Sequence, residues 1–402
     1  MERSLYIQGI KDLAFRHNKM AFLTGPRQTG KTTLALSIGD SFPQKKYYNW
    51  DDVEFQKKWI KNPKQLVEQT VQKEKPLLIL DELHKAPRWK NTLKGLYDTS
   101  HSLTEILVTG SAKLDVFRRG GDSLLGRYFL FHLHPFSLGE LTQSPGNPDN
   151  LFEKLLMPLP SFENQLDQLL RFGGFPDPFL KQDMEFYRAW QRMRLEKLIR
   201  EDLIDLTRVH EVSLIQSMAH ILPEKVGSLF SLQSVCEDLQ INHPTAKRWL
   251  GWLEQLFYIF TIPPYSSKIT RSIRKQPKIY LWDWSVLEDS AAKFENLVAS
   301  HLLKSVHWWN DTGKGNFELY FVRDKEKREV DFLITKEKKP WLLVECKEND
   351  TEVSPNLAYF SALLKPQRTL QIVREPGIHR KFDAAGTEGT IISAGSFLPL
   401  LF

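Results

Sequence analysis

Cysteine is scarce in this sequence, and long apolar runs are missing from it. The chain of 402 residues has two cysteines, Cys236 and Cys346, which stand in different segments. A disulfide framework and a cysteine-based zinc cluster are therefore excluded, and a reducing compartment is the simplest setting. No stretch approaches the length of a membrane-spanning helix, and the first residues carry no secretory signal pattern. The sequence thus predicts a cytoplasmic protein without a membrane partner.

Charge of one sign is only slightly in excess. The net charge is +6, and hydrophobic residues make up 41% of the chain, which is ordinary for a globular protein. The isoelectric point near 9.0 permits a nucleic-acid partner, DNA or RNA, but an ordinary basic enzyme fits this charge equally well. At this length, we expect two or three domains.

Short apolar runs alternate with longer helix-like segments in the first third of the chain. Buried runs of this kind predict an α/β domain with a parallel sheet over residues 1–142. The runs are Met20–Thr24, Lys46–Trp50, Pro76–Leu80, Glu105–Thr109 and Tyr128–Leu133. Residues 143–265 read as a helical and winged-helix-like region, and residues 266–402 read as a second, smaller α/β domain.

A phosphate-binding motif stands between an apolar strand and a helix-like segment. Glycines let backbone N–H groups surround a triphosphate, Lys31 would contact the β- and γ-phosphates, and Thr32 would ligate Mg²⁺. A glycine-rich turn with an incidental lysine is the plainer alternative, but the strand–loop–helix order favours ATP and Mg²⁺ as cofactors. The predicted cofactor-binding residues are Gly25, Pro26, Arg27, Gln28, Thr29, Gly30, Lys31, Thr32 and Thr33.

Two acids follow the apolar run Pro76–Leu80. The carboxyl end of a parallel strand lies beside the phosphates in P-loop enzymes. Asp81 would hold the Mg²⁺ shell, and Glu82 would polarise the attacking water. Acids that merely face solvent after a strand are the alternative, but the complete phosphate-binding motif upstream favours an ATP-hydrolysing enzyme.

Further residues could assist hydrolysis. Ser111 follows the next buried strand, where a small polar side chain would contact the γ-phosphate or position the water. Arg127 precedes another strand and would stabilise the charge of phosphoryl transfer, either in its own chain or in a neighbouring subunit. Arg118 and Arg119 are rivals for that role, and a structural arginine is equally consistent with the pattern. Sharing of an arginine between chains would require a homo-oligomer.

Together these motifs resemble an AAA-type ATPase family of bacteria and archaea. The resemblance rests on FLTGPRQTGKTTL, YYNWDD, LLILDELHK, VTGSAK and SLLGRYF, and it continues through GGFPDPFL, KRWLGWLEQLFYIFTIPPY, PKIYLWDW and FENLVASHLL. It covers nearly the whole chain. It implies an ATPase core, a helical and winged-helix-like middle, and a C-terminal restriction-endonuclease-like α/β domain of a type long labelled as of unknown function. It implies no physiological role.

Two strand-like segments near the C-terminus resemble the core of PD-(D/E)XK nucleases. Asp331 and Glu345 would hold one Mg²⁺, with Glu295 of an upstream helix as a further ligand. Lys347 lies two residues after Glu345, on the same strand face, where it would orient a water or stabilise charge on the phosphate. The proline usual before the first acid is absent, since Glu329-Val330 stands there. A charged hairpin, or this fold without cleavage, explains the same residues.

A helix-turn-helix pattern occupies Ser231–Pro264, with the second helix expected to start near Thr245. Lys247 and Arg248, near that start, would contact DNA, although such modules also serve as protein-contact units. A basic stretch further on would line a phosphate backbone, and a solvated charged face is at least as consistent with it. It comprises Lys268, Arg271, Arg274, Lys275 and Lys278.

Three functions are compatible with these features. The leading one is an ATP-hydrolysing AAA-type enzyme that acts on nucleic acid and carries a metal-dependent nuclease site. The second is an ATP-regulated binding or scaffold protein whose nuclease-like domain is inactive. The third is a nuclease whose ATPase part acts as a sensor. Glu82 favours turnover over a pure switch, and Lys347 beside Glu345 favours cleavage over an inert fold.

Overall fold

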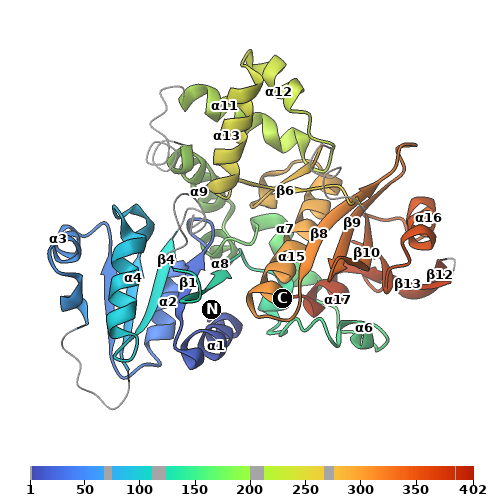
Figure 1. Cartoon of the computed structure of the whole chain (residues 1–402). Coiled ribbons are helices and arrows are strands. Elements are labelled where there is room, and N and C mark those ends of the chain that lie inside the picture. Colours follow the sequence, from blue (N-terminus) through green and yellow to red (C-terminus); the bar gives the residue numbers. More distant parts are fainter. Residues whose placement is uncertain (1, 68–74, 111–123, 200–211, 267–275, 385) are drawn as a thin grey trace. The chain divides into compact units, whose positions relative to one another are not determined.

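The computed structural model describes residues 2–67, 75–110, 124–199, 212–266, 276–384 and 386–402 (Figure 1). The chain divides into two compact units, Met1–His134 and Pro135–Phe402, and each is described by itself below. The division into three domains at residues 142 and 265 stays a prediction. Among the described helices, none combines the length and the apolar character that crossing a membrane requires.

A five-stranded parallel sheet forms the centre of the N-terminal unit. The strand order is β2-β3-β4-β1-β5, and every neighbouring pair is parallel. The strands are β1 Met20–Thr24, β2 Lys45–Asn49, β3 Leu77–Asp81, β4 Glu105–Gly110 and β5 Tyr128–His132. The predicted parallel sheet is confirmed. Strands β2 and β3 are each displaced by one residue from the predicted runs, so that Asp81 is the last residue of β3 and not the residue after it.

Helices enclose this sheet because its strands are apolar toward both faces. Leu78 and Leu80 of β3 share a core cluster with Phe55 of α3 and Leu93 of α4, while Leu77 and Ile79 alternate with them and are also buried. The helices are α1 Ser4–Leu13, α2 Lys31–Gly39, α3 Val53–Lys61 and α4 Trp89–Ser100, with short 3-10 turns at Phe15–His17, Pro63–Leu66 and Leu83–Lys85.

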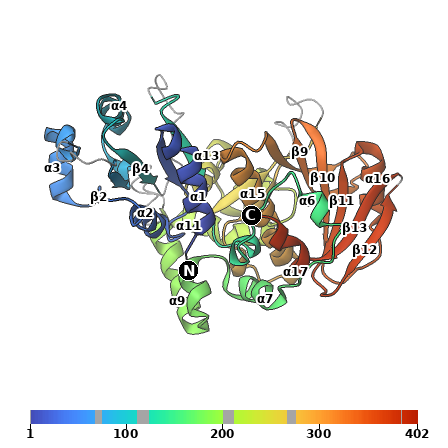
Figure 2. The same cartoon turned by 90° about the horizontal axis from the view of Figure 1, so that it is seen from below.

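A six-stranded mixed sheet forms the largest part of the C-terminal unit. Its order is β12-β13-β11-β10-β9-β8, and Figure 2 shows β9, β10, β11, β13 and β12 in that sequence across the sheet. Strands β10, β11 and β13 run parallel, and the outer pairs are antiparallel. The strands are β8 Phe317–Arg323, β9 Glu329–Lys336, β10 Lys339–Lys347, β11 Arg368–Val373, β12 His379–Ala384 and β13 Thr387–Ser393. The predicted second α/β unit thus has a mixed sheet.

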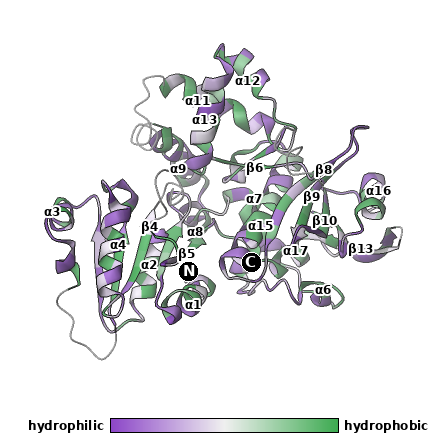
Figure 3. Cartoon of the chain, viewed as in Figure 1, coloured by the Kyte–Doolittle hydropathy of each residue, from purple (hydrophilic) through white to green (hydrophobic). Residues whose placement is uncertain are grey.

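Two helices contribute apolar residues to different clusters on this sheet. The long helix α15, Ser290–Asp311, shares a cluster with Leu342 and Val344 of β10, whereas Leu343 packs with α16, Pro355–Leu364. Alternate residues of β10 therefore serve opposite faces. Strands β9, β10 and β11 are mostly hydrophobic within the sheet, whereas the edge strand β12 is mostly polar and the tip of the β8–β9 hairpin is hydrophilic (Figure 3). Short helical segments α17, Ala394–Phe397, and Leu398–Leu400 end the chain.

Helices fill the first part of the C-terminal unit. They are α5 Leu138–Leu141, α6 Leu151–Lys154, α7 Glu163–Phe172, α8 Pro176–Lys181, α9 Met184–Lys197, α11 Val212–Ile221, α12 Leu232–Leu239 and α13 His243–Gln255, with 3-10 turns at Leu222–Lys225 and Trp284–Val286. Strands β6, Ile259–Ile262, and β7, Lys278–Leu281, then pair antiparallel.

The helix-turn-helix pattern corresponds to α12 and α13, but α13 begins earlier than expected. Its N-cap is Asn242, whose side-chain oxygen accepts a hydrogen bond from the backbone N–H of Thr245 at 2.9 Å. Pro244 stands in the first turn, where its missing N–H costs nothing. The expected start at Thr245 is therefore wrong by two residues, because the capping asparagine was the stronger signal.

Candidate functional site

The predicted phosphate-binding loop connects the end of β1 to the start of α2. A Cβ atom on Gly25 would lie 2.1 Å from the backbone oxygen of Leu133, so only glycine fits there. Gly30 caps α2 with a φ of 86°, in the left-handed region that favours glycine. Both glycines are thus required by the backbone path, which curls from strand to helix. Thr33 lies beyond the curl on α2 and is exposed.

The side chain of Lys31 is buried inside this loop. Its ammonium group donates to the backbone oxygens of Gly25 at 3.0 Å and Pro26 at 2.6 Å. Thr29 also donates to the Pro26 oxygen, at 2.8 Å, which tightens the turn. The buried ammonium is held by carbonyl oxygens, partners that phosphate oxygens can replace. Arg27 and Gln28 are half-buried on the same loop, and Gln28 adopts a φ of 62°.

Asp81, at the end of β3, receives hydrogen bonds from three hydroxyl groups. Thr32 Oγ1 and the Tyr47 hydroxyl each donate to Asp81 Oδ2 at 2.8 Å, and Thr109 Oγ1 donates to Oδ1. Burial and the neighbouring Asp81 carboxylate raise the pKa of Tyr47 to about 12, so its hydroxyl stays protonated. The carboxylate is therefore fixed beside the loop by neutral donors. Neither Tyr47 nor Thr109 was predicted as a site residue, although Thr109 lies only two residues before Ser111.

Glu82 follows Asp81 in a left-handed conformation, with a φ of 54°. Its backbone N–H donates to Thr109 Oγ1 at 3.4 Å, so Thr109 contacts both acids. His84 Nε2 lies 3.6 Å from the Glu82 carboxylate. Burial lowers the pKa of His84, so the imidazole is neutral near pH 7 and this contact is no ion pair. Glu82 thus lies between the strand end at Asp81 and this neutral imidazole.

Arg127 lies at the N-terminal ends of the strands, whereas the phosphate-binding loop of the same chain lies at their C-terminal ends. Tyr128 pairs with Met20 at the start of β1, whereas the loop follows Thr24, about 13 Å further along the strand. Arg127 makes a bidentate ion pair with Asp98, in which Nε lies 2.7 Å from Oδ1 and Nη2 lies 3.1 Å from Oδ2. A role in the same chain's site therefore does not fit this geometry, and a role in a neighbouring subunit stays a prediction. Ser111, Arg118 and Arg119 lie outside the described residues.

Two of the predicted nuclease residues of the C-terminal unit, Glu295 and Asp331, lie together with Glu329 around a lysine. Lys278 Nζ lies 2.8 Å from Glu329, 3.3 Å from Glu295 and 3.5 Å from Asp331. The Tyr280 hydroxyl donates to Glu295 at 2.7 Å. Lys278 is only 1% exposed, so the expectation that it lines a phosphate backbone is wrong. The neighbouring basic residues 268, 271, 274 and 275 lie outside the described residues.

Glu345 and Lys347, the other two predicted residues, pair with each other on β10. Lys347 Nζ lies 2.9 Å from Glu345 Oε1, and the backbone N–H of Cys346 donates to Asp331 at 2.9 Å. Burial, followed by repulsion from Asp331, raises the pKa values of Glu295 and Glu345 to about 7. For Glu345, desolvation outweighs the pairing with Lys347, because Glu345 is buried and Lys347 is about one-third exposed.

These residues do not fit a divalent metal ion in the arrangement that they have. Within the part of the chain that the structure describes, no group of three or more histidine, cysteine, aspartate or glutamate side chains is arranged to hold one. The expected Mg²⁺ ligands Glu295 and Asp331 both contact the ammonium of Lys278, and the third, Glu345, contacts the ammonium of Lys347. Lys347 is thereby engaged by a carboxylate. Glu329 and Lys278 were not predicted as members of this cluster, because only the three-dimensional arrangement brings them next to Glu295 and Asp331.

Comparison with known families accounts for most of the chain. Residues 17–142 match a family model described as an AAA domain. These residues form an AAA domain. Residues 163–296 and 291–383 match two models described as domains of unknown function, DUF8612 and DUF4143. The AAA domain accordingly holds the phosphate-binding loop, whereas the carboxylate cluster belongs to the parts without an assigned function.

Curated relatives are distant but extend over much of the chain. An uncharacterized protein of Mycobacterium tuberculosis is 23% identical over 374 residues, which cover 91% of this chain and 78% of that protein. An uncharacterized protein of Methanocaldococcus jannaschii is 25% identical over 289 residues, which cover 65% of this chain and 60% of that protein.

Two solved structures are similar to part of the chain. The Walker-type ATPase of Pyrococcus abyssi aligns over 70% of this chain and 93% of its own, with 13% identity and a TM-score of 0.45. AMPPCP-bound DnaA from Aquifex aeolicus aligns over 62% of this chain and 86% of its own, with 17% identity and a TM-score of 0.32.

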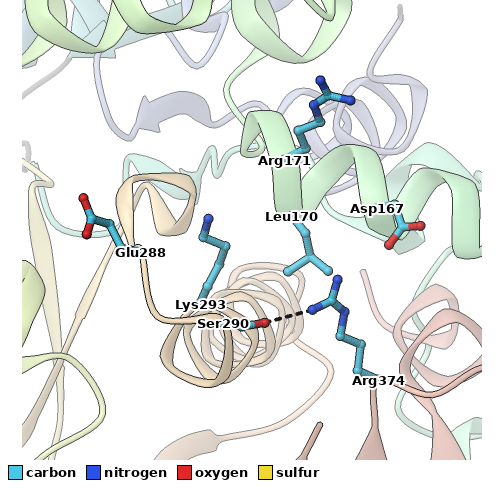
Figure 4. Close-up of a pocket in the computed structure, with 7 residues that line it drawn as sticks. All are labelled: Asp167, Leu170, Arg171, Glu288, Ser290, Lys293 and Arg374. Atoms are coloured by element: carbon cyan, nitrogen blue, oxygen red, sulfur yellow. Dashed lines mark hydrogen bonds between the residues drawn. The ribbon is translucent and has the colours of Figure 1, made fainter. Parts of the chain in front are cut away.

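A cavity of about 420 Å³ lies in the C-terminal unit, and none of the predicted site residues lines it (Figure 4). It is lined by Asp167, Leu170, Arg171, Glu288, Ser290, Lys293 and Arg374. Arg374 donates to Ser290 at 2.9 Å and lies 3.6 Å from Glu348. The lining thus carries three basic side chains, Arg171, Lys293 and Arg374, and two acidic ones, Asp167 and Glu288.

Proposed function

We propose that the AAA domain binds ATP with Mg²⁺ and hydrolyses the ATP. The observation that carries the proposal is the hydrogen bond between Thr32 and Asp81, which brings the hydroxyl of the loop and the carboxylate of β3 side by side. Hard oxygen donors of these two kinds suit Mg²⁺ in phosphoryl-transfer sites. Since Asp81 is held by neutral hydroxyl groups, its negative charge is available to a cation.

Each residue then has a distinct task. Lys31 exchanges its carbonyl partners for oxygens of the β- and γ-phosphates, and Thr32 and Asp81 hold the Mg²⁺ shell. Bound Mg²⁺ would neutralise charge on the phosphates. Glu82 orients and polarises the water that attacks the γ-phosphate. Arg27, Gln28, Thr29 and Thr33 belong to the loop or its helix and shape the phosphate seat.

Nucleotide binding is tested by removing the lysine charge. Lys31→Ala should weaken ATP binding by about 100-fold, because the phosphates of ATP lose a buried cationic partner. Lys45→Ala is a matched control, since Lys45 lies in the same unit but pairs with the exposed Asp40. Affinity is measured by titration with a fluorescent ATP analogue, and circular dichroism verifies folding. Unchanged affinity in folded Lys31→Ala protein would refute the assignment.

A second candidate function, binding of nucleic acid, is favoured by the surface of α13. Lys247 and Arg248 are exposed near the start of this helix, and the Arg248 guanidinium lies 5.3 Å from the ring of Trp252. Adjacent cations at the start of the second helix of such a pair suit contacts with phosphates and bases.

This binding is tested with labelled DNA and RNA. The double variant Lys247→Ala/Arg248→Ala should bind more weakly and lower the salt slope by about two, one for each lost phosphate contact. Lys314→Ala, another exposed lysine of the same unit, is the control. Fluorescence anisotropy at several salt concentrations measures both quantities. Equal binding by all three proteins would exclude α13 as the contact surface.

The nuclease site predicted from Asp331, Glu345 and Lys347, with Glu295 in support, receives less support than its alternative. Three of these side chains are acids that contact lysine ammonium groups, so cations of the chain itself lie where a metal ion would bind. This arrangement supports an ATP-regulated binding protein whose nuclease-like domain does not cleave.

A further inference from the structure

One buried ammonium group contacts three carboxylates of the C-terminal unit. We propose that Lys278, and not a divalent metal ion, is the resident cation of the cluster formed by Glu295, Glu329 and Asp331. The consequence is that this cluster takes up no Mg²⁺ or Mn²⁺ and performs no metal-dependent cleavage of phosphodiesters. The inference does not depend on ATP hydrolysis by the AAA domain.

The backbone holds Lys278 at this place from both sides. Lys278 pairs with Ile262 of β6, and its other edge forms an isolated bridge with Leu229. Tyr280, two residues further on, therefore extends to the same side, and both side chains reach Glu295. The lysine is a component of a paired strand and not a surface side chain that could move aside.

The carboxylates surround the ammonium group of Lys278 as they would surround a metal ion. An ammonium group offers three N–H donors, and three acids, Glu329, Glu295 and Asp331, lie within 2.8 to 3.5 Å of Nζ. A divalent cation bound by these carboxylates would lie about 2.0–2.6 Å from their oxygens. Lys278 Nζ already occupies the space between the carboxylates where such an ion would bind. The second oxygen of Glu329 accepts from Arg323 at 2.6 Å, which compensates this carboxylate further.

Because they are buried, the ammonium group of Lys278 and the neighbouring carboxylates each need the other as a partner. The side chain of Lys278 is 2% exposed and that of Asp331 is 16% exposed. A buried charge is tolerated only when it is paired, so removal of the ammonium would leave neighbouring carboxylates that repel one another. Such a group would then recruit another cation. Loss of Lys278 should therefore create a metal site, which removal of an ordinary buried lysine would not.

The experiment compares Mn²⁺ binding by the full chain, without nucleotide, across five proteins. They are the wild type, Asp331→Asn, Lys278→Met, the double variant Lys278→Met/Asp331→Asn, and Lys304→Met. Lys304 is the matched control, because it is equally buried but contacts one carboxylate, Glu140, at 2.5 Å. Electron paramagnetic resonance of free Mn²⁺ counts the bound ions, and circular dichroism verifies folding.

We expect wild type and Asp331→Asn to give the same Mn²⁺ titration. Lys278→Met should gain one site, at least about tenfold tighter than any wild-type site, and the added Asp331→Asn should remove it. Lys304→Met should gain none. The proposal is overturned if wild type loses a Mn²⁺ site on Asp331→Asn substitution, or if folded Lys278→Met gains no site.

A cleavage assay provides an arm that needs no folded Lys278 variant. Wild type and Asp331→Asn are incubated with single- and double-stranded DNA and RNA in the presence of Mn²⁺ or Mg²⁺, with and without ATP. We expect no cleavage that depends on Asp331. Products formed by wild type and absent with Asp331→Asn would overturn the proposal, whatever the folding of the other variants.

Discussion

Two acidic sites in this molecule hold their carboxylates in opposite ways. In the AAA domain, Asp81 is fixed by the hydroxyl groups of Thr32, Tyr47 and Thr109. In the C-terminal unit, Asp331 contacts the ammonium of Lys278. A hydroxyl orients a carboxylate without removing its charge, whereas an ammonium compensates that charge. The carboxylate at the proposed Mg²⁺ site therefore has neutral donors around it, whereas the C-terminal carboxylates surround an ammonium group.

The largest expected effect concerns Arg127, which tests whether the ATP site is complete within one chain. If Arg127 serves a neighbouring subunit's ATP, Arg127→Ala should reduce turnover by about 1,000-fold, as loss of an arginine finger does. Mixed oligomers of Arg127→Ala and Lys31→Ala chains should then recover some activity. Asp98→Asn is the control, since it breaks the same ion pair and keeps the arginine. Absence of recovery in demonstrably mixed oligomers counts against a shared site.

The second effect concerns Glu82, which we propose to polarise the attacking water, whereas Asp81 holds the metal ion. Glu82→Gln should lower turnover by about 100-fold while ATP binding stays intact, because the water loses its polarising carboxylate. Glu54→Gln, an exposed acid of the same unit, should leave both unchanged. Phosphate release and nucleotide titration measure the two quantities. Wild-type turnover in Glu82→Gln would assign the chemistry to another residue.

Much of the fold can be predicted from sequence because the deciding patterns are local. Runs such as Met20–Thr24 are apolar toward both faces, which only a strand covered by helices allows. The strand order β2-β3-β4-β1-β5 cannot be predicted in this way, because it depends on pairing between distant segments. The start of α13 depends on which polar residue is its N-cap, and both Asn242 and Thr245 carry side chains that can cap the N-terminus of a helix.

The candidate sites show the same limit. Gly25, Gly30 and Lys31 lie within one loop, so their spacing carries the prediction by itself. Tyr47 reaches Asp81 because β2 pairs with β3 in a register that sets Asn49 beside Asp81. Lys278 reaches Asp331 across the C-terminal unit, and its burial is invisible in a basic sequence stretch. A local sequence pattern cannot predict contacts between residues that only strand pairing and packing bring together.

Acid should weaken the C-terminal unit through a buried histidine. His301 accepts a hydrogen bond from the backbone N–H of Leu138 at 2.9 Å, and burial lowers the pKa of His301 to about 3. Its unfolded pKa lies near 6.5, so the stability that it contributes is fully present above that pH and is lost as pH falls toward 3. Between pH 7 and pH 5, wild type should lose about 2 kcal/mol from this group.

The variant His301→Phe isolates this contribution. It loses the Leu138 hydrogen bond at every pH, so its overall stability falls, but it cannot bind the proton. Urea unfolding at several pH values should therefore give a shallower pH dependence than in wild type. His220→Phe is the control, since His220 is exposed in the same unit. Parallel pH profiles for His301→Phe and wild type would show that His301 contributes nothing to acid sensitivity.

The smallest expected effect separates a neutral donor from an ionic one. The Tyr47 hydroxyl is one of three donors to Asp81, so Tyr47→Phe leaves the carboxylate charged but less firmly oriented. A hydrogen bond from a neutral hydroxyl to a carboxylate is worth about 1.5 kcal/mol, so the half-saturating Mg²⁺ concentration for ATP hydrolysis should rise by about tenfold. Tyr48→Phe, on the opposite face of β2, should not change it. An unaltered Mg²⁺ dependence in Tyr47→Phe would remove this hydroxyl from the site. A loss approaching that of Glu82→Gln would mean that the hydroxyl does more than orient Asp81, and the contrast between the two acidic sites would fail.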